Sequence, residues 1–194
     1  MALRLVISGL AASGKTTIAK RLARRYKLKM YAGSDFLKNF AKRLGLKPSK
    51  NWWDTEEGMQ FLERRKANPA IDRYVDAMLV NKLKKGNVVI TSWTLPYLNI
   101  DAIKVFLHAS KEERARRLAK RDKISVGEAL KTVEKRDREN NELYKIIYGF
   151  ELGKDLNVYD LVVDTTKKTA EDVEGEIIEF IEKHLERKVQ GKKG

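Results

Sequence analysis

The chain of 194 residues is long enough for one α/β domain with a sizeable core, and no apolar run approaches the roughly 20 residues of a membrane span. The absence of cysteine excludes disulfides and thiolate chemistry, and the first residues predict a strand rather than a signal peptide, so we expect a cytoplasmic protein. The net charge of +14 leaves three interpretations open: a solvated basic surface, phosphate-rich small substrates, or nucleic acid.

The first half of the chain predicts strands and helices in alternation. The periodicity predicts a strand over residues 3–7, a helix over 15–26, a short strand over 29–31 and a helix from about 34 to 44. Gly45 is a typical helix end. Residues 48–85 are polar and predict two further helices, with Pro48 and Pro69 as breaks.

The second half continues the alternation. Strands are predicted over residues 87–91, 103–107 and 159–163, and helices over 110–121, 125–148 and 170–185. Ser110 and Glu113 form a capping-box pattern at the start of the first of these helices. Strands that alternate with helices indicate a parallel sheet with helices on both faces, here a five-stranded one in a single domain over residues 1–187. Residues 188–194 are expected to form a flexible basic tail.

The segment between the first strand and the first helix carries the strongest motif. Residues 9–16 read GLAASGKT and fit G-x-x-x-x-G-K-[ST], the loop whose backbone N–H groups surround the phosphates of a nucleoside triphosphate. Lys15 is expected to reach the β- and γ-phosphates, and the Thr16 hydroxyl is expected to bind Mg²⁺. The residues predicted to bind ATP are Gly9, Ala11, Ala12, Ser13, Gly14, Lys15, Thr16 and Thr17.

Other motifs narrow the class of P-loop protein. We find neither the Asp-x-x-Gly and Asn-Lys-x-Asp of nucleotide switches nor the Asp-Glu strand end of motors. A late arginine cluster instead suits the mobile lid of a small kinase, because guanidinium groups bind phosphate with two donors. A solvated helix face, with pairs to Glu112, Glu113 and Asp122, is the alternative for any one of these arginines. They are Arg114, Arg116, Arg117, Arg121, Arg136 and Arg138.

Several segments together resemble the archaeal-type cytidylate kinases, within the nucleoside monophosphate kinase family. They are the P-loop and the stretches YAGSDFLKNFAKRLGL, NPAIDRYVD, AIKVFLHASKEERARRLAKRDKISVGEAL and YKIIYGFELGKDLNVYDLVVDTT, which span most of residues 3–185. The resemblance implies a P-loop kinase that uses ATP and Mg²⁺ to phosphorylate CMP, and dCMP as well. It also implies a helical acceptor-binding insert over about residues 34–86 and a lid over about 115–145.

Individual roles follow from the same resemblance. Asp35 takes the place of the acceptor-segment aspartate. The lid arginines would contact the transferring phosphate and the acceptor, and the resemblance gives a catalytic role to Lys15, Arg117, Arg121, Arg136 and Arg138. Asp72 and Arg73 match a helix packed over the base, although an ion pair between helices explains them equally well.

Two departures alter the acceptor side. Lys38 stands where the family has an arginine, and a lysine offers a point charge without a two-pronged donor. After the third strand the family reads Glu-Gly-Arg, whereas this chain reads Thr91-Ser92-Trp93. Trp93 either stacks on the acceptor base or fills the core, and Trp52 and Trp53 pose a similar choice between a lid over the acceptor and a partner-binding patch.

Two further functions therefore stay open. One is a kinase of the same fold with another small phosphate or hydroxyl compound as acceptor. The other is an ATP-dependent RNA-associated module, which the basic charge favours but no RNA-binding motif supports. We expect a monomer whose partner is a small-molecule phosphoryl acceptor, with no membrane association and with nucleic acid as the less favoured partner.

Overall fold

The computed structural model describes residues 2–49 and 51–190 and contains one five-stranded parallel sheet. The strands are β1 (Arg4–Ser8), β2 (Lys29–Ala32), β3 (Val88–Thr91), β4 (Ile103–His108) and β5 (Leu161–Asp164). Their order across the sheet is β2-β3-β1-β4-β5, so β1 lies at the centre between β3 and β4. The expected five-stranded parallel sheet is confirmed.

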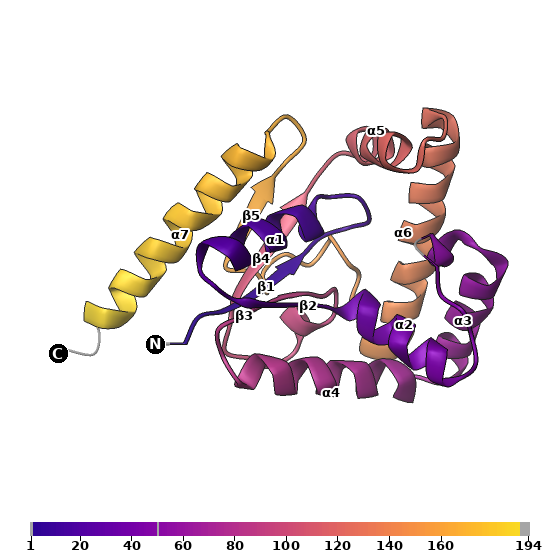
Figure 1. The fold of residues 1–194 in the computed structure, drawn as a ribbon, viewed down its shortest axis with the longest axis horizontal. Helices are drawn as coiled ribbons and strands as arrows, with labels where there is room; N and C mark the ends of the chain where they lie inside the picture. The colour runs from indigo at the N-terminus through magenta and orange to yellow at the C-terminus, as the bar shows by residue number, and fades with distance from the viewer. Residues whose placement is uncertain (1, 50, 191–194) are drawn as a thin grey trace.

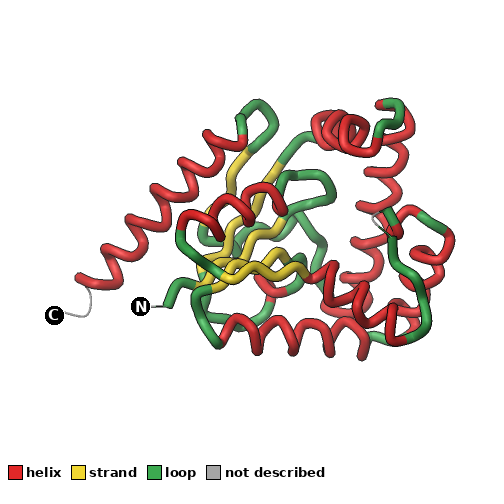
Figure 2. The backbone as a smooth tube through the Cα atoms, viewed as in Figure 1, coloured by secondary structure: helices red, strands yellow, loops and turns green. Residues whose placement is uncertain are grey.

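Helices cover both faces of this sheet (Figures 1 and 2). On one face, α1 (Lys15–Arg25) and α7 (Ala170–Gln190) pack on alternate residues of the strands, among them Leu5, Ile7 and Val105. On the other face, Val6 and Ile90 contact the core formed with α2 (Gly33–Arg43) and α4 (Ala70–Lys84). Side chains of successive strand residues point to opposite faces, which is why neighbours in one strand enter different cores.

The remaining helices form two projections from the sheet. The segment predicted to be an acceptor-binding insert, called the insert below, continues from α2 through η1 (Trp52–Asp54) and α3 (Glu56–Ala67) into α4. The segment predicted to be a lid, called the lid below, is the hairpin of α5 (Lys111–Asp122) and α6 (Val126–Tyr148), and the α5 and α6 N-termini are capped by Ser110 and Ser125. A short turn, η2 (Leu95–Tyr97), follows β3. Figure 1 shows α6 beside α3, and the two helices are in contact. Residues of both segments also line one cavity.

Several boundaries differ from the sequence prediction for local reasons. The last strand begins at Leu161 rather than Tyr159, because Tyr159 lies in a turn whose N–H donates to the Leu156 carbonyl. The last helix continues to Gln190, into the segment expected to be a flexible tail, and residues 191–194 of that tail lie outside the described residues. None of the helices in the described part of the chain is long and apolar enough to cross a bilayer.

Packing between η1 and α3 depends on a missing side chain at Gly58. A Cβ placed there would lie 2.0 Å from the Trp52 carbonyl oxygen, which is backbone and cannot move without opening the turn. We expect Gly58→Ala to destabilise the fold by about 2 kcal/mol through overpacking, measured by chemical denaturation. Gly175→Ala in α7 is the matched control, because a Cβ there meets no atom within 4 Å of the described residues. It should be neutral or slightly stabilising, and equal losses in both variants would contradict this packing constraint.

Candidate active site

The phosphate loop occupies the carboxyl end of the central strand β1. Gly9, Ala12 and Gly14 all have positive φ (142°, 61° and 99°), which curls the backbone between the strand and α1. A Cβ at Gly9 would lie 2.4 Å from the Leu107 carbonyl oxygen, so both the conformation and the space require glycine. The Ser13 hydroxyl is buried beneath the loop with no hydrogen-bond partner among the described residues. This curled loop at a helix N-terminus is a ready anion-binding site.

Lys15 folds back onto its own loop. Its ammonium donates to the Leu10 carbonyl at 2.6 Å and lies 5.6 Å from the centre of the Trp93 ring. Burial lowers the pKa of Lys15 to about 7, and the nearby charges of Arg114 and Arg136 act in the same direction. A phosphate group would supply the negative charge that this position lacks, so we expect phosphate binding to raise the pKa.

A cavity of about 510 Å³ opens beside the loop, between the insert and the lid. Its size is typical of a small-molecule site. Basic side chains surround it: Lys15, Lys38, Arg65, Arg121, Lys131, Lys135 and Arg136. The same lining holds four acids, Asp54, Asp72, Asp76 and Glu139, so the basic side chains are in excess and favour an anionic ligand.

The floor of this cavity holds a buried ion pair. Arg65 of α3 donates to both carboxylate oxygens of Asp72, at 2.9 and 2.6 Å, and also to the Tyr144 hydroxyl at 3.2 Å. Both charged side chains are nearly inaccessible to solvent (2% and 4%). Because the pair satisfies itself, it fixes α3, α4 and α6 relative to one another.

Asp76 lies one helical turn further along α4 and also lines the cavity. It accepts hydrogen bonds from the Thr94 and Tyr148 hydroxyls, the former at 2.5 Å. Burial raises the pKa of Asp76 to about 6, against the opposing effect of these two hydrogen bonds. Asp76 is therefore a carboxylate near neutral pH, and its partners are neutral hydroxyls rather than a cation.

Arg114 connects the lid to the phosphate loop. It is 3% exposed, and it donates to both oxygens of Asp137 on α6 (3.0 and 2.7 Å) and to the Ala11 carbonyl at 3.3 Å. Arg114 therefore joins α5, α6 and the loop through Nη1 and Nη2, while its Nε is buried without a hydrogen-bond partner among the described residues.

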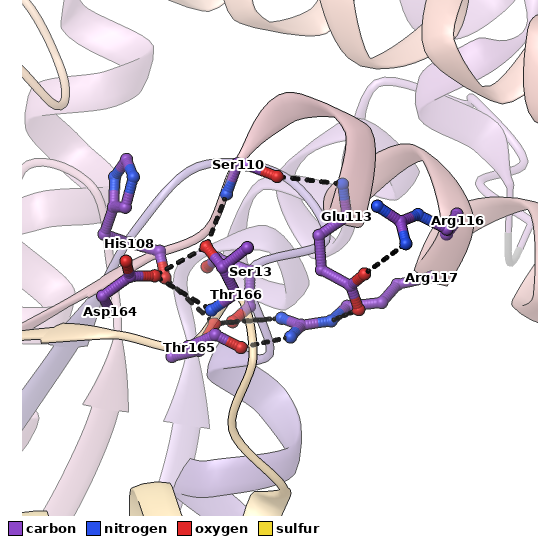
Figure 3. A network of polar contacts seen from close by, with 9 residues as sticks. All are labelled: Ser13, His108, Ser110, Glu113, Arg116, Arg117, Asp164, Thr165 and Thr166. Atoms are coloured by element: carbon purple, nitrogen blue, oxygen red, sulfur yellow. Dashed lines mark hydrogen bonds and ion pairs between the residues drawn. The ribbon is translucent and has the colours of Figure 1, made fainter.

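Arg117 lies on the other side of the phosphate loop. It donates to the Thr165 carbonyl at 2.6 Å, the Thr165 hydroxyl at 3.0 Å and the Ser13 carbonyl at 3.4 Å, while Glu113 accepts from its Nε (Figure 3). A second cavity of about 190 Å³ adjoins it. Its lining comes from the start of α1 and from the segment after β5: Ser13, Gly14, Thr17, Ile18, Arg117, Thr165, Lys168, Thr169, Ala170 and Val173.

The other lid arginines separate into two groups. Arg136 lines the larger cavity and binds Asp54 with two donors, and Arg121 lines the same cavity while it pairs with Asp122. Arg138 was expected beside them, but it does not line the cavity. Its side chain is 62% exposed and pairs with Glu139, because it lies on a different face of α6 from Arg136.

Residues 5–167 match the model of the cytidylate kinase-like family. The cytidylate kinase of Pyrococcus horikoshii is 38% identical over 171 residues, covering 87% of this chain and 83% of that protein. The cytidylate kinase of Pyrococcus abyssi is 37% identical over 187 residues, covering 95% of this chain and 96% of that protein.

The chain belongs to the cytidylate kinase-like family. It is a cytidylate-kinase-like small-molecule kinase, and the resemblance seen in its sequence is confirmed. Among solved structures, the shikimate kinase of Aquifex aeolicus matches the fold with a TM-score of 0.57 at 20% identity, covering 94% of this chain and 98% of that one. That likeness concerns the P-loop kinase fold alone.

The acceptor-side residues expected for this family are only partly brought together. Lys38 lines the cavity and donates to the Ser49 carbonyl at 2.7 Å, and burial lowers its pKa. Asp35 and Arg73 are exposed and are not among the lining residues, because each lies on the outer face of its helix. Asp72 does line the cavity, and it forms an ion pair between helices with Arg65 of α3, which was the alternative to a role over the base. Arg73 is exposed and is not the partner in this pair.

The three tryptophans are placed differently from one another. Trp93 is half-buried, lines the cavity, and donates from its indole N–H to the Gly9 carbonyl at 2.6 Å, with its ring edge-on to Tyr144. Trp52 is 1% exposed and belongs to the core, so it is neither a lid nor a surface patch. Trp53 lines the cavity, 5.9 Å from the Arg65 guanidinium.

Thr16 is exposed at the start of α1 and lines the larger cavity next to Lys15. Among the described residues, no group of three or more His, Cys, Asp or Glu could hold a metal ion. A Mg²⁺ ion does not require such a group, since it keeps several waters and takes most other ligands from the nucleotide phosphates. The residues therefore fit a magnesium ion that arrives with a nucleotide, with the Thr16 hydroxyl as a ligand.

The sequence analysis missed Arg65, Asp76 and Tyr144. A signal was present, because Arg65, Asp72 and Asp76 all lie on otherwise apolar helix faces. Asp72 and Asp76 alternate with Ile71, Val75 and Leu79 on the buried side of α4. A charged residue on a buried face requires a partner or a function.

The lowered pKa of Lys15 makes a prediction for ATP binding. At pH 8 the free protein holds Lys15 largely neutral, so ATP should bind with uptake of a proton by this side chain, and at pH 6 the uptake should be much smaller. Calorimetric titrations in two buffers of different ionisation enthalpy measure this uptake. Lys15→Met is the control and should lose it. Equal uptake in the two proteins at pH 8 would contradict the lowered pKa.

Proposed function

We propose that this kinase transfers the γ-phosphoryl group of ATP to a pyrimidine nucleoside monophosphate, with CMP and dCMP as the preferred acceptors. Family membership supports a small-molecule kinase of this type. The choice of cytosine rests on a single feature, the Asp76 carboxylate at the floor of the larger cavity.

The phosphate loop divides the two substrates between the two cavities. The smaller cavity, beside Arg117 and the segment after β5, has the apolar lining of Ile18 and Val173 that suits the base of ATP. The larger cavity holds the acceptor. The phosphates of both substrates then meet at Lys15, which can stabilise the negative charge that spreads over the transferring group.

The acceptor base can be selected by its hydrogen-bonding edge. A carboxylate accepts hydrogen bonds, so Asp76 favours the 4-amino group of cytosine and disfavours the 4-carbonyl of uracil. Thr94 and Tyr148 already donate to Asp76, and each carboxylate oxygen keeps a further lone pair for a ligand. Trp93 and Trp53, which also line the cavity, offer aromatic faces to such a base.

The basic residues of the larger cavity suit the acceptor phosphate. Arg121, Arg136 and Lys38 stand at the cavity wall. When bound, Mg²⁺ would neutralise charge on the β- and γ-phosphates, with the Thr16 hydroxyl as its protein ligand. Lys38 and the residues after β3 replace two arginines typical of the family, so we expect a weaker grip on the acceptor phosphate than in relatives that keep them.

A screen of acceptors tests this proposal. ADP formation is measured with CMP, dCMP, UMP, AMP, nucleosides, sugar phosphates and shikimate-type hydroxy acids, each with Mg²⁺ and ATP. CMP and dCMP should give the highest kcat/KM, and Lys15→Met should lower turnover about 10²- to 10³-fold. A hydroxyl compound that exceeds CMP would overturn the choice of acceptor. Steeply salt-dependent RNA binding without turnover of any acceptor would favour an RNA-associated module.

Asp76 gives a sharper prediction within the same proposal. Asp76→Asn replaces an acceptor-only group by one that also donates, so kcat/KM for CMP should fall about 10- to 100-fold while that for UMP falls less or rises. The preference of the wild-type enzyme for CMP over UMP should also narrow below pH 6, where Asp76 becomes protonated. Both are read from kcat/KM between pH 5 and 8.

The matched control is Asp101→Asn, which alters an exposed ion pair with Arg4. Asp101→Asn should leave kcat/KM unchanged for both CMP and UMP. Asp76 does not read the base if Asp76→Asn lowers kcat/KM for CMP and for UMP by the same factor and also lowers the thermal stability of the protein.

A further inference from the structure

The carboxylate of Asp54 links the insert to the lid through Arg136. Asp54 belongs to η1, in the insert, and lines the larger cavity opposite the lid. Its two oxygens accept from Nε (2.6 Å) and Nη2 of Arg136 on α6. Asp54 is thus a direct bridge from the acceptor side to the lid.

The charges around this bridge are unbalanced. Burial is the main cause of the lowered pKa of Lys15 and of Lys38, and the charge of Arg136 adds to it. The hydrogen bond to Asp122 is the main cause of the raised pKa of Arg121, and the charge of Asp54 adds to it. These side chains therefore lie within electrostatic reach of one another. Two other carboxylates near the site have partners of their own, since Asp137 binds Arg114 and Glu139 binds Lys66. Asp54 is one of four acids that line the cavity, and it is the one that binds the lid arginine Arg136.

Among the described residues, the contact with Asp54 occupies one edge of the Arg136 guanidinium and leaves its other edge available to a ligand. Asp54 takes the edge of Arg136 formed by Nε and Nη2. The opposite edge, with both hydrogens of Nη1 and one of Nη2, keeps the planar pair of donors that phosphate requires. A guanidinium held by one edge therefore presents its other edge in a fixed direction.

Both ends of the bridge are packed against the rest of the protein. The turn that carries Asp54 is anchored by Trp52, which is 1% exposed, packs on Phe61 and donates from its indole to Glu57. The side chain of Arg136 is itself 17% exposed. Holding a long side chain in one rotamer before the substrate binds removes an entropic cost from the later step.

We propose that Asp54 is a positioning residue for phosphoryl transfer, which holds Arg136 by one edge so that the other edge binds the transferring or acceptor phosphate. This inference rests on the proposed function of the larger cavity. Two other roles for Asp54 are possible. It could be a tether that only connects the insert to the lid, or an inhibitory latch that Arg136 must leave before phosphate can bind.

A double-mutant cycle tests the proposal on the full chain. The four proteins are the wild type, Asp54→Asn, Arg136→Ala and the double variant, assayed for kcat and KM with ATP and the best acceptor. Asp54→Asn should lower kcat about 10- to 100-fold and leave the KM for ATP within about twofold. In the Arg136→Ala background the same change should have almost no further effect, because Asp54 acts through Arg136.

Glu142→Gln is the matched control. Glu142 pairs with Lys66 and so also links α6 to α3, but it does not line the cavity. It should leave kcat unchanged, and a loss equal to that of Asp54→Asn would reduce Asp54 to a tether. A rise in kcat in Asp54→Asn would show an inhibitory latch, and additive losses in the cycle would show that Asp54 acts on its own. Each of these results overturns the proposal.

A binding measurement separates this inference from the proposed function. The probe is a bisubstrate analogue that joins adenosine and cytidine through five phosphates, titrated calorimetrically into the same four proteins. Asp54→Asn and Arg136→Ala should weaken its binding by similar factors that do not add. Failure of the wild type to phosphorylate CMP would refute the acceptor, whereas additive factors in the binding cycle would refute the role of Asp54.

Discussion

The buried guanidinium of Arg114 holds the catalytic half of the molecule together. It binds Asp137 with two donors and the Ala11 carbonyl with a third contact, so one side chain joins α5, α6 and the phosphate loop. A charge removed from water needs a partner of this kind, and removal of either member would leave the other uncompensated. Together with the hydrogen bonds of Arg117 to Ser13 and Thr165, this contact positions the α5–α6 hairpin relative to Lys15.

The acceptor side is built on a second buried pair with a different consequence. Arg65 and Asp72 neutralise each other, which leaves Asp76 beside them as a carboxylate with two neutral hydroxyl partners. The two acids lie one turn apart on α4 and both line the cavity, but Asp72 is neutralised by a guanidinium whereas Asp76 accepts from hydroxyls. Their surroundings rather than the residue type therefore distinguish the two carboxylates.

The parts of the molecule that local sequence patterns encode could be predicted. The strands are short apolar runs, and the phosphate loop is contiguous, so both could be predicted from neighbouring residues. The cavity floor could not, because Arg65, Asp76 and Tyr144 come from three helices and meet only through tertiary packing. The family resemblance predicted Asp35, Arg73 and Arg138 at the site from their place in the sequence alone. All three are exposed, because each lies on an outward face of its helix. Arg114 was counted with the lid arginines, and nothing in its spacing distinguished an internal partner from a phosphate.

The central place of β1 in the sheet also bears on how the chain folds. This first strand pairs with Val88–Thr91 on one side and with residues 103–106 on the other, so its apolar residues have no strand partner until about half of the chain has been synthesised. Parallel pairings at such separations close large loops and form slowly. During synthesis, β1 therefore stays without its partner strands β3 and β4 for longer than the other strands do. During that time its apolar residues can aggregate or bind chaperones.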